Sequence, residues 1–263
     1  MANNGRFGKL DFDKKGTSTE PVADPWPNLD EDACIAAGDE AYSLGKYEVA
    51  LSAYSRALRY NKDASAAWIG QVRCLISLGE YREAVVWANR ALDRFPASAN
   101  VLACKGLALA LDGDIRQGME YLDGAVEMRA TSAFVWAARG ESLLLAPNSA
   151  ENAHRCFLKA LEIAPEDWSL MLRIAIAYNR AKLYGKARDL LQAASRFADR
   201  NPLVLFHLGA SYEGLGQYAV ATGYYQRALD SRGDFNEAKT ALRRAQLSGP
   251  FGFLKRVWRM ERP

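Results

Sequence analysis

Residues Ser65 to Ser98 read SAAWIGQVRCLISLGEYREAVVWANRALDRFPAS and contain two helical patterns. In the second pattern Ala84, Ala88 and Ala91 recur at i, i+4 and i+7, which is the spacing of one helix face. A Gly-x-Tyr step at Gly79 and Tyr81 separates the two patterns. Glycine at such a step supplies the positive φ that ends a helix. We therefore predict two helices joined by a tight turn.

The same pattern recurs along the chain with a period of 34 or 35 residues. Because one helix pair cannot bury its own apolar face, repetition of this kind indicates a stacked array of pairs. Three columns show the period: Ala57, Ala91, Ala125, Ala160, Ala194 and Ala228; Ala50, Ala84, Gly118, Ala153, Ala187 and Ala221; and Tyr54, Ala88, Leu122, Phe157, Leu191 and Tyr225.

These residues resemble the tetratricopeptide repeat family. The unit from Ser65 to Ser98 carries the residue types that the family pattern expects, namely Trp68, Leu75, Gly79, Tyr81, Ala84, Ala91 and Pro96. The resemblance implies an all-α, right-handed α-solenoid of six helix-turn-helix units and a C-terminal capping helix. The units are 31–64, 65–98, 99–132, 133–167, 168–201 and 202–235, and the capping helix is 236–247.

Three positions depart from the family pattern. The fourth unit has one extra residue near Ala146 to Ser149, where the turn between its helices is expected. Gly118 replaces a small-residue alanine in the third unit, and Ala175 stands where glycine is usual in the fifth.

Composition and charge restrict the function. Among 263 residues, 34 Lys and Arg stand against 31 Asp and Glu, a formal net charge of +3. This near-neutral balance does not suit a surface-wide nucleic-acid footprint, so we expect no nucleic-acid partner. Four isolated cysteines, Cys34, Cys74, Cys104 and Cys156, lack the C-x-x-C pairing of zinc and redox sites, and we interpret them as reduced core residues.

Motifs of catalysis and of membrane targeting are missing from the sequence. There is no phosphate loop, dinucleotide fingerprint, nucleophile elbow or H-E-x-x-H helix, so we expect no enzyme and no cofactor. Neither a secretory signal nor a run of 18 apolar residues is present, which predicts a cytoplasmic protein.

The resemblance also implies that the first helix of each unit lines a concave groove for a partner segment. By family phase the lining is acidic at one end, apolar in the middle and basic towards the other end. Such a lining suits an extended or helical segment with apolar anchors and an acid. A phase error of one residue would instead turn half of these side chains into packing between repeats, so both interpretations stay open. The predicted groove residues are Ile69, Arg73, Leu107, Phe134, Glu141, Arg173, Ile176, Asn179, Arg180 and His207.

One subtype of the family clamps the terminal carboxylate of chaperone tails with Lys and Asn on the first helices. The corresponding positions here are Ile35, Asp39 and Gly70, and none of them is a cation or an amide. We therefore do not expect a chaperone C-terminus as the ligand.

The two ends of the chain offer further contacts. Residues 1–30 are predicted to be a flexible leader, and 248–263 a linker with a basic amphipathic tail of charge 4 − 1 = +3. The tail is open to three interpretations: docking on a partner or on the protein itself, weak attachment to a membrane surface, or no contact. The candidate contact residues are Phe7, Leu10 and Phe12 in the leader, and Phe251, Leu254, Lys255, Trp258 and Arg259 in the tail.

Two functional hypotheses follow. The first is a non-catalytic scaffold or adaptor that binds a protein or peptide segment in its groove. The alternative is an assembly factor that acts through its terminal segments, by forming homo-oligomers or by attaching to a membrane surface.

Overall fold

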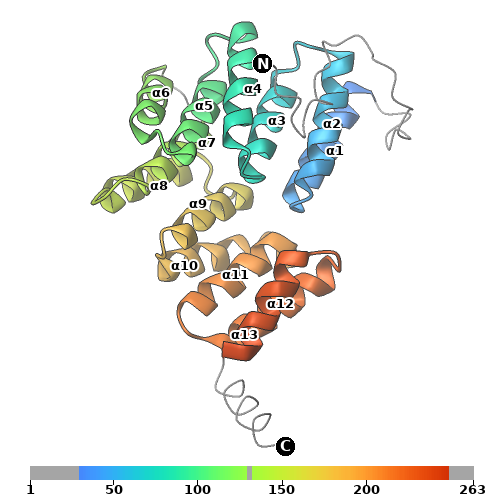
Figure 1. Ribbon diagram of the computed structural model, residues 1–263, viewed down its shortest axis with the longest axis vertical. Helices are drawn as coiled ribbons and strands as arrows, with labels where there is room; N and C mark the ends of the chain where they lie inside the picture. The colour runs from blue at the N-terminus through green and yellow to red at the C-terminus, as the bar shows by residue number, and fades with distance from the viewer. Residues whose placement is uncertain (1–29, 129–131, 249–263) are drawn as a thin grey trace, which may run out of the picture. The chain divides into compact units, whose positions relative to one another are not determined.

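The computed structural model describes residues 30–128 and 132–248, and every regular element in these ranges is an α-helix (Figure 1). The chain divides into two compact units, 1–130 and 131–263. Thirteen helices lie in the described residues, as six sequential pairs and one further helix, which confirms the predicted fold class. Unit 1 contains α1 (Glu31–Ser43), α2 (Tyr47–Tyr60), α3 (Ser65–Ser77), α4 (Tyr81–Arg94), α5 (Ala99–Asp112) and α6 (Ile115–Glu127). Unit 2 contains α7 (Ala133–Leu143), α8 (Ala150–Ile163), α9 (Trp168–Arg180), α10 (Tyr184–Ala194), α11 (Pro202–Gly214), α12 (Tyr218–Ser231) and α13 (Asn236–Ser248).

Within each unit the helices pack in chain order, each against the next. The first helices of successive repeats also touch: α1 contacts α3 and α3 contacts α5, and in unit 2 α7 contacts α9 and α9 contacts α11. The first helices of a unit therefore lie side by side, and their outward side chains form one face.

Polar caps begin several of these first helices. Asp30 accepts a hydrogen bond from the backbone N–H of Ala33 at 2.9 Å, and Asp167 accepts bonds from Ser169 and Leu170. Asn201 caps α11 in the same way, with Pro202 in the first turn. Each cap satisfies N–H groups that have no partner within the helix.

The turns inside the repeats contain a residue in the left-handed region. Four are glycines, at Gly45, Gly79, Gly113 and Gly216. The extra residue of the fourth unit lies in the turn between α7 and α8, as predicted, and Asn148 has a φ of 55° there. In the fifth unit Lys182 takes this position with a φ of 61°, a conformation that is strained for a residue with a Cβ.

Inside each repeat, one residue of the first helix is matched in size to a residue 16 positions later in the second helix, or 17 later in the fourth repeat. A Cβ added at Gly38, Gly140 or Gly209 would lie about 2.5–2.6 Å from an aromatic ring of the partner position. Val72 pairs with the small Ala88, and Ala175 pairs with Leu191. Gly106 also pairs with a leucine, but a Cβ there would lie 2.7 Å from the carbonyl oxygen of Gly118, which excludes alanine in the third repeat. We call these buried residues the size pairs: Gly38/Tyr54, Val72/Ala88, Gly106/Leu122, Gly140/Phe157, Ala175/Leu191 and Gly209/Tyr225.

The third repeat has the closest backbone approach. A Cβ at Gly118 on α6 would lie 2.6 Å from the carbonyl oxygen of Gly106 and 2.8 Å from the backbone nitrogen of Ala110, both on α5. Glycine therefore replaces the expected alanine because the two helices cross with no room for a methyl group.

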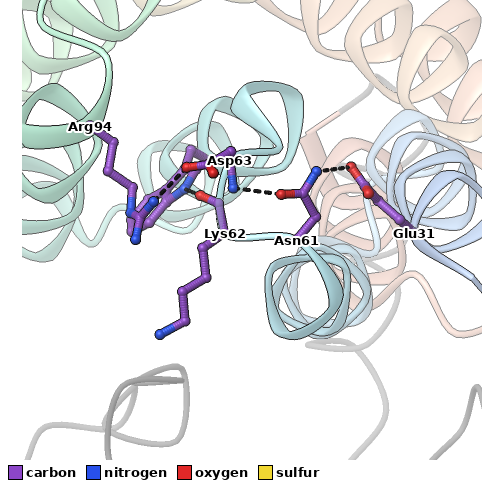
Figure 2. A network of polar contacts seen from close by, with 6 residues as sticks. Glu31, Asn61, Lys62, Asp63 and Arg94 are labelled. Carbon is purple, nitrogen blue, oxygen red and sulfur yellow. Dashed lines mark hydrogen bonds and ion pairs between the residues drawn. The ribbon is translucent and has the colours of Figure 1, made fainter.

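The connection between α2 and α3 joins three helices by polar contacts (Figure 2). Asn61 donates from Nδ2 to Glu31 Oε1 at 3.0 Å and accepts from the backbone N–H of Asp63 at 2.8 Å. Arg94, at the end of α4, places Nη1 2.5 Å from Asp63 Oδ1. Because Arg94 and Asp63 are exposed, their ion pair contributes at most about 1 kcal/mol, and the network mainly fixes the loop.

Helix α13 packs on the last repeat, where the sequence predicts a capping helix, and is one residue longer than predicted. Its Ala241 and Ala245 are buried against Ala221 and Tyr225. Arg244 donates to both carboxylate oxygens of Glu213 at 2.6 and 2.8 Å, and Tyr225 Oη donates to Glu213 Oε2 at 2.6 Å. One carboxylate on α11 thus holds residues of α12 and α13.

This contact predicts a pH dependence of the docking of α13. Burial alone would raise the pKa of the Glu213 carboxyl, but the hydrogen bonds from Arg244 and Tyr225 outweigh it and lower that pKa below 4.5. A lowered folded-state pKa stabilises the docked helix above pH 4.5 and less as the pH falls through the folded-state value. We expect hydrogen exchange of the α13 amides, corrected for intrinsic rates, to accelerate relative to α9 between pH 6 and pH 3. In the Glu213→Gln variant this relative acceleration should be absent, and its persistence would contradict the assignment.

The four cysteines, all within the described residues, form no disulfide and are buried, as predicted for small core residues. Among residues 30–128 and 132–248, no helix is both long enough and apolar enough to cross a bilayer.

Candidate functional site

The predicted groove residues of unit 1 lie on α3 and α5. Ile69 and Arg73 are half-buried, and the guanidinium carbon of Arg73 lies 4.7 Å from the centre of the Tyr42 ring on α1. Leu107 is fully buried, so its prediction as an accessible groove residue is wrong. Leu107 follows Gly106 on α5, at the close crossing with α6, and contributes to the core instead.

In unit 2 the predicted residues form two matched contacts between α7 and α9. The guanidinium carbon of Arg173 lies 4.8 Å from the centre of the Phe134 ring. Two helical turns further along, Arg180 Nη1 lies 2.8 Å from Glu141 Oε1. Both contacts join residues 39 positions apart, because Phe134 and Glu141 are seven residues apart on α7, as are Arg173 and Arg180 on α9.

Glu141 does not line the groove in the way that the sequence predicts. It is 5% exposed and buried next to the more exposed Arg180, so it is not available to a partner and its prediction is corrected. Its role is to hold Arg180, since a buried carboxylate requires a charged or hydrogen-bonding neighbour.

Arg173 has no such carboxylate. Within the described residues, Nε and Nη2 of its guanidinium are buried and have no hydrogen-bond partner. Its guanidinium lies over the ring of Phe134, a contact that stabilises a cation by about 0.5–2 kcal/mol without satisfying its N–H donors.

The next helix, α11, joins this face through polar contacts. Asn179 donates from Nδ2 to the carbonyl oxygen of His207 at 3.1 Å and accepts from Ser211 Oγ at 2.9 Å. Desolvation of the His207 ring, together with the charge of Arg180, lowers the pKa of His207 to about 4, so the imidazole is neutral at physiological pH. Ser211 was missed by sequence reasoning, although a serine at a buried position of an apolar helix is a signal for such a bond.

We define the first-helix face of unit 2 by six residues on three neighbouring helices. Its two arginines are cationic, its histidine is neutral, and Glu141 beside it is neutralised by Arg180, so the face carries one guanidinium without an acid. The arrangement suits recognition of an anion beside apolar groups. The six residues are Phe134, Arg173, Ile176, Asn179, Arg180 and His207.

Other predicted contacts are not described by the structure. Phe7, Leu10 and Phe12 in the leader, and Phe251, Leu254, Lys255, Trp258 and Arg259 in the tail, lie outside residues 30–128 and 132–248. Within those ranges no three His, Cys, Asp or Glu side chains gather in a way that suits a metal ion.

Comparison with solved structures gives matches to tetratricopeptide repeat proteins. A tetratricopeptide repeat protein from Parabacteroides merdae is 17% identical, with a TM-score of 0.56 over 85% of this chain and 86% of that chain. The crystal structure of an APC/C hetero-tetramer, Cut9–Hcn1, is 18% identical, with a TM-score of 0.55 over 82% of this chain. This chain spans only 43% of the length of the matched chain in that complex. At these identities the likeness concerns the fold.

Comparison with curated protein sequences gave no match. A sequence model of the tetratricopeptide repeat family matches residues 35–99 and 142–202, which lie in both units. Together with the repeat period and the six helix pairs, this match shows that the chain belongs to the tetratricopeptide repeat family, whose repeats are a general protein–protein interaction module.

Proposed function

We propose that this protein is a non-catalytic adaptor that binds a segment of a partner protein on the first-helix face of unit 2. The observation that carries the proposal is the combination of partly exposed apolar and polar side chains on three adjacent helices. Phe134 and Ile176 offer apolar contact area, while Asn179 and Arg180 offer polar groups beside them.

Contacts across the helices hold these side chains in place before any partner arrives. Arg180 is held by Glu141 at 2.8 Å, and Asn179 by Ser211 and by the backbone of His207. Side chains that are ordered in advance lose less conformational entropy on binding, so more of each contact contributes to affinity. A surface of this kind favours recognition over mere packing.

Position-specific cross-linking tests the location of the site. Phe134 and Phe197 are each replaced by p-azidophenylalanine in the full chain, because this residue keeps the phenyl ring at both positions. Phe197 follows α10 and is 53% exposed, so it provides a more accessible control outside the face. After illumination in an extract of native cells, we expect discrete protein adducts at least several-fold more abundant from position 134 than from position 197. Equal labelling from both positions, or labelling from 197 alone, would contradict the proposal.

A further inference from the structure

We propose that Arg173 is the receptor for a carboxylate of the partner segment, so that unit 2 selects segments in which an Asp or Glu is flanked by apolar residues. This inference rests on the proposed function and adds the chemistry of the ligand. Its basis is a guanidinium that the fold holds in place but leaves without an acid.

The two unsatisfied donors belong to one edge of the guanidinium. The N–H bonds of Nε and Nη2 point in parallel from this edge, which is the arrangement that binds both oxygens of a carboxylate. The neighbouring contact two turns along α9 shows that an acid suits this register, because Arg180 has Glu141 where Arg173 has Phe134. Among the described residues, no carboxylate pairs with Arg173.

Helices α7 and α11, which flank α9, carry one carboxylate each, and neither is paired with Arg173. Glu141 Oε1 on α7 is engaged by Arg180, and Glu213 on α11 is engaged by Arg244 and Tyr225. On these three helices both carboxylates therefore already have a cation, whereas the guanidinium of Arg173 has no carboxylate. An incoming carboxylate restores the balance, whereas an incoming cation would meet repulsion.

The side chain has to move to meet its ligand, because Nε and Nη2 are shielded from solvent in the unbound chain. Buried N–H donors without a partner cost free energy in the unbound chain. Moving the guanidinium out of this arrangement therefore requires little free energy. Phe134 and Ile176 then contact the residues that flank the acid, which defines the apolar part of the recognised segment.

A first consequence concerns the chain without a partner. Arg173→Met keeps a flexible apolar side chain on the Phe134 ring and removes the unsatisfied donors. We expect a thermal unfolding midpoint equal to the wild type or up to about 2–4 °C higher. An arginine with a purely structural role would give the opposite result, a lower midpoint.

The binding test uses the full chain and a defined probe, a phage-displayed library of random 12-residue peptides. Selected peptides are synthesised, and their affinities are measured by fluorescence polarisation against wild type, Arg173→Gln and Arg155→Gln. Arg155 lies on the second helix α8 with a side chain 72% exposed, so it is the control for loss of one positive charge in the same unit.

We expect the selected peptides to share an acidic position. Changing that residue to its amide, or Arg173 to Gln, should each weaken binding by about 10–50-fold, and both changes together should cost little more than either alone. Arg155→Gln should leave the affinity within about two-fold, as is typical of an exposed charge away from the contact.

The possible failures are distinct. Peptides that are cross-linked by p-azidophenylalanine at position 134 but share no acid, or bind Arg173→Gln as tightly as wild type, would overturn the carboxylate assignment and leave the proposed face intact. If the selection yields no peptide that is cross-linked at position 134, both the assignment and the proposed face are overturned.

Discussion

Replacing Gly118 by alanine is expected to destabilise unit 1 by about 3 kcal/mol, although alanine occupies this position in the other five repeats. The new methyl group would lie 2.6 Å from the carbonyl oxygen of Gly106 and 2.8 Å from the backbone nitrogen of Ala110. Both obstacles are backbone atoms, so α5 and α6 have to separate, and no rotation of a side chain relieves the overlap. The higher helix propensity of alanine offsets only about 1 kcal/mol of this cost.

Gly124, on the same helix, is the matched control. A Cβ there would meet only Leu102 Cδ2, at an ordinary contact distance of 3.6 Å. Gly124→Ala should therefore stabilise the helix by up to about 1 kcal/mol. Urea unfolding followed by circular dichroism, with hydrogen exchange to locate the change in α5 and α6, measures both variants. A Gly118→Ala protein as stable as the Gly124→Ala protein would refute the backbone overlap.

The second large effect is expected at a size pair in unit 2. In Gly140→Ala the new methyl group would lie 2.5 Å from Phe157 Cε1 and 2.7 Å from Cδ1. The Phe157 ring is 1% exposed and packs edge-on against Tyr178 at 5.0 Å, so it has little space in which to move. We expect a loss of about 2–3 kcal/mol.

Shortening the partner should restore part of this loss. Phe157→Leu alone leaves a cavity and should cost about 1–2 kcal/mol. In the double variant alanine faces leucine, as Ala175 faces Leu191 in the fifth repeat. The rescue should be incomplete, because the carbonyl oxygen of Ala153 remains 3.0 Å from the new methyl group.

A double-mutant cycle of urea unfolding free energies gives the coupling between these two positions. We expect the double variant to be more stable than the sum of the single changes predicts, by about 1.5 kcal/mol or more. Strict additivity would show that the two residues do not share one packing site. The pair Gly223→Ala and Phe157→Leu is the control, because a Cβ at Gly223 meets no atom within 4 Å and the two effects should add.

The sequence predicted the repeats and their turns well, because both depend on local patterns. The apolar columns set the helix pairs, and a glycine, or Asn148 in the longer fourth unit, marks the left-handed turn residue. The turn at Lys182 is one that a local pattern does not predict. Its positive φ is imposed by the helices on either side, and its side chain gives no local sign of that conformation.

Two of the departures from the family pattern are explained by packing between helices, which the sequence pattern does not show. Ala175 and Gly118 are irregular when each is compared with its own column. In the structure, Ala175 is matched to Leu191 on the opposite helix, and Gly118 meets the backbone of Gly106. Such compensation between two helices is a property of pairs of positions. It cannot be recognised when one position is compared across the repeats.

The candidate site was predicted in outline and not in detail. Leu107 and Glu141 are both the ninth residue of their repeats, and both are buried. Arg73 and Ile176 share that position and are half-buried. The accessibility of the ninth residue depends on the helices that neighbour it in each repeat. A prediction that treats this position alike in all repeats therefore assigns some residues wrongly.

The size pairs also determine which segments of this protein can be shuffled, in evolution or in the laboratory. A crossover in the turn inside a repeat would join halves that do not match, for example Val72 with Phe157, and would overfill the site. A crossover between repeats keeps each pair together and should be tolerated. Two junctions are exceptions. A Cβ at Gly70 would lie 2.5 Å from the Tyr54 ring of the first repeat, and a Cβ at Gly214 would lie 2.5 Å from the Tyr184 ring of the fifth. The first two repeats and the last two should therefore each be inherited as one block.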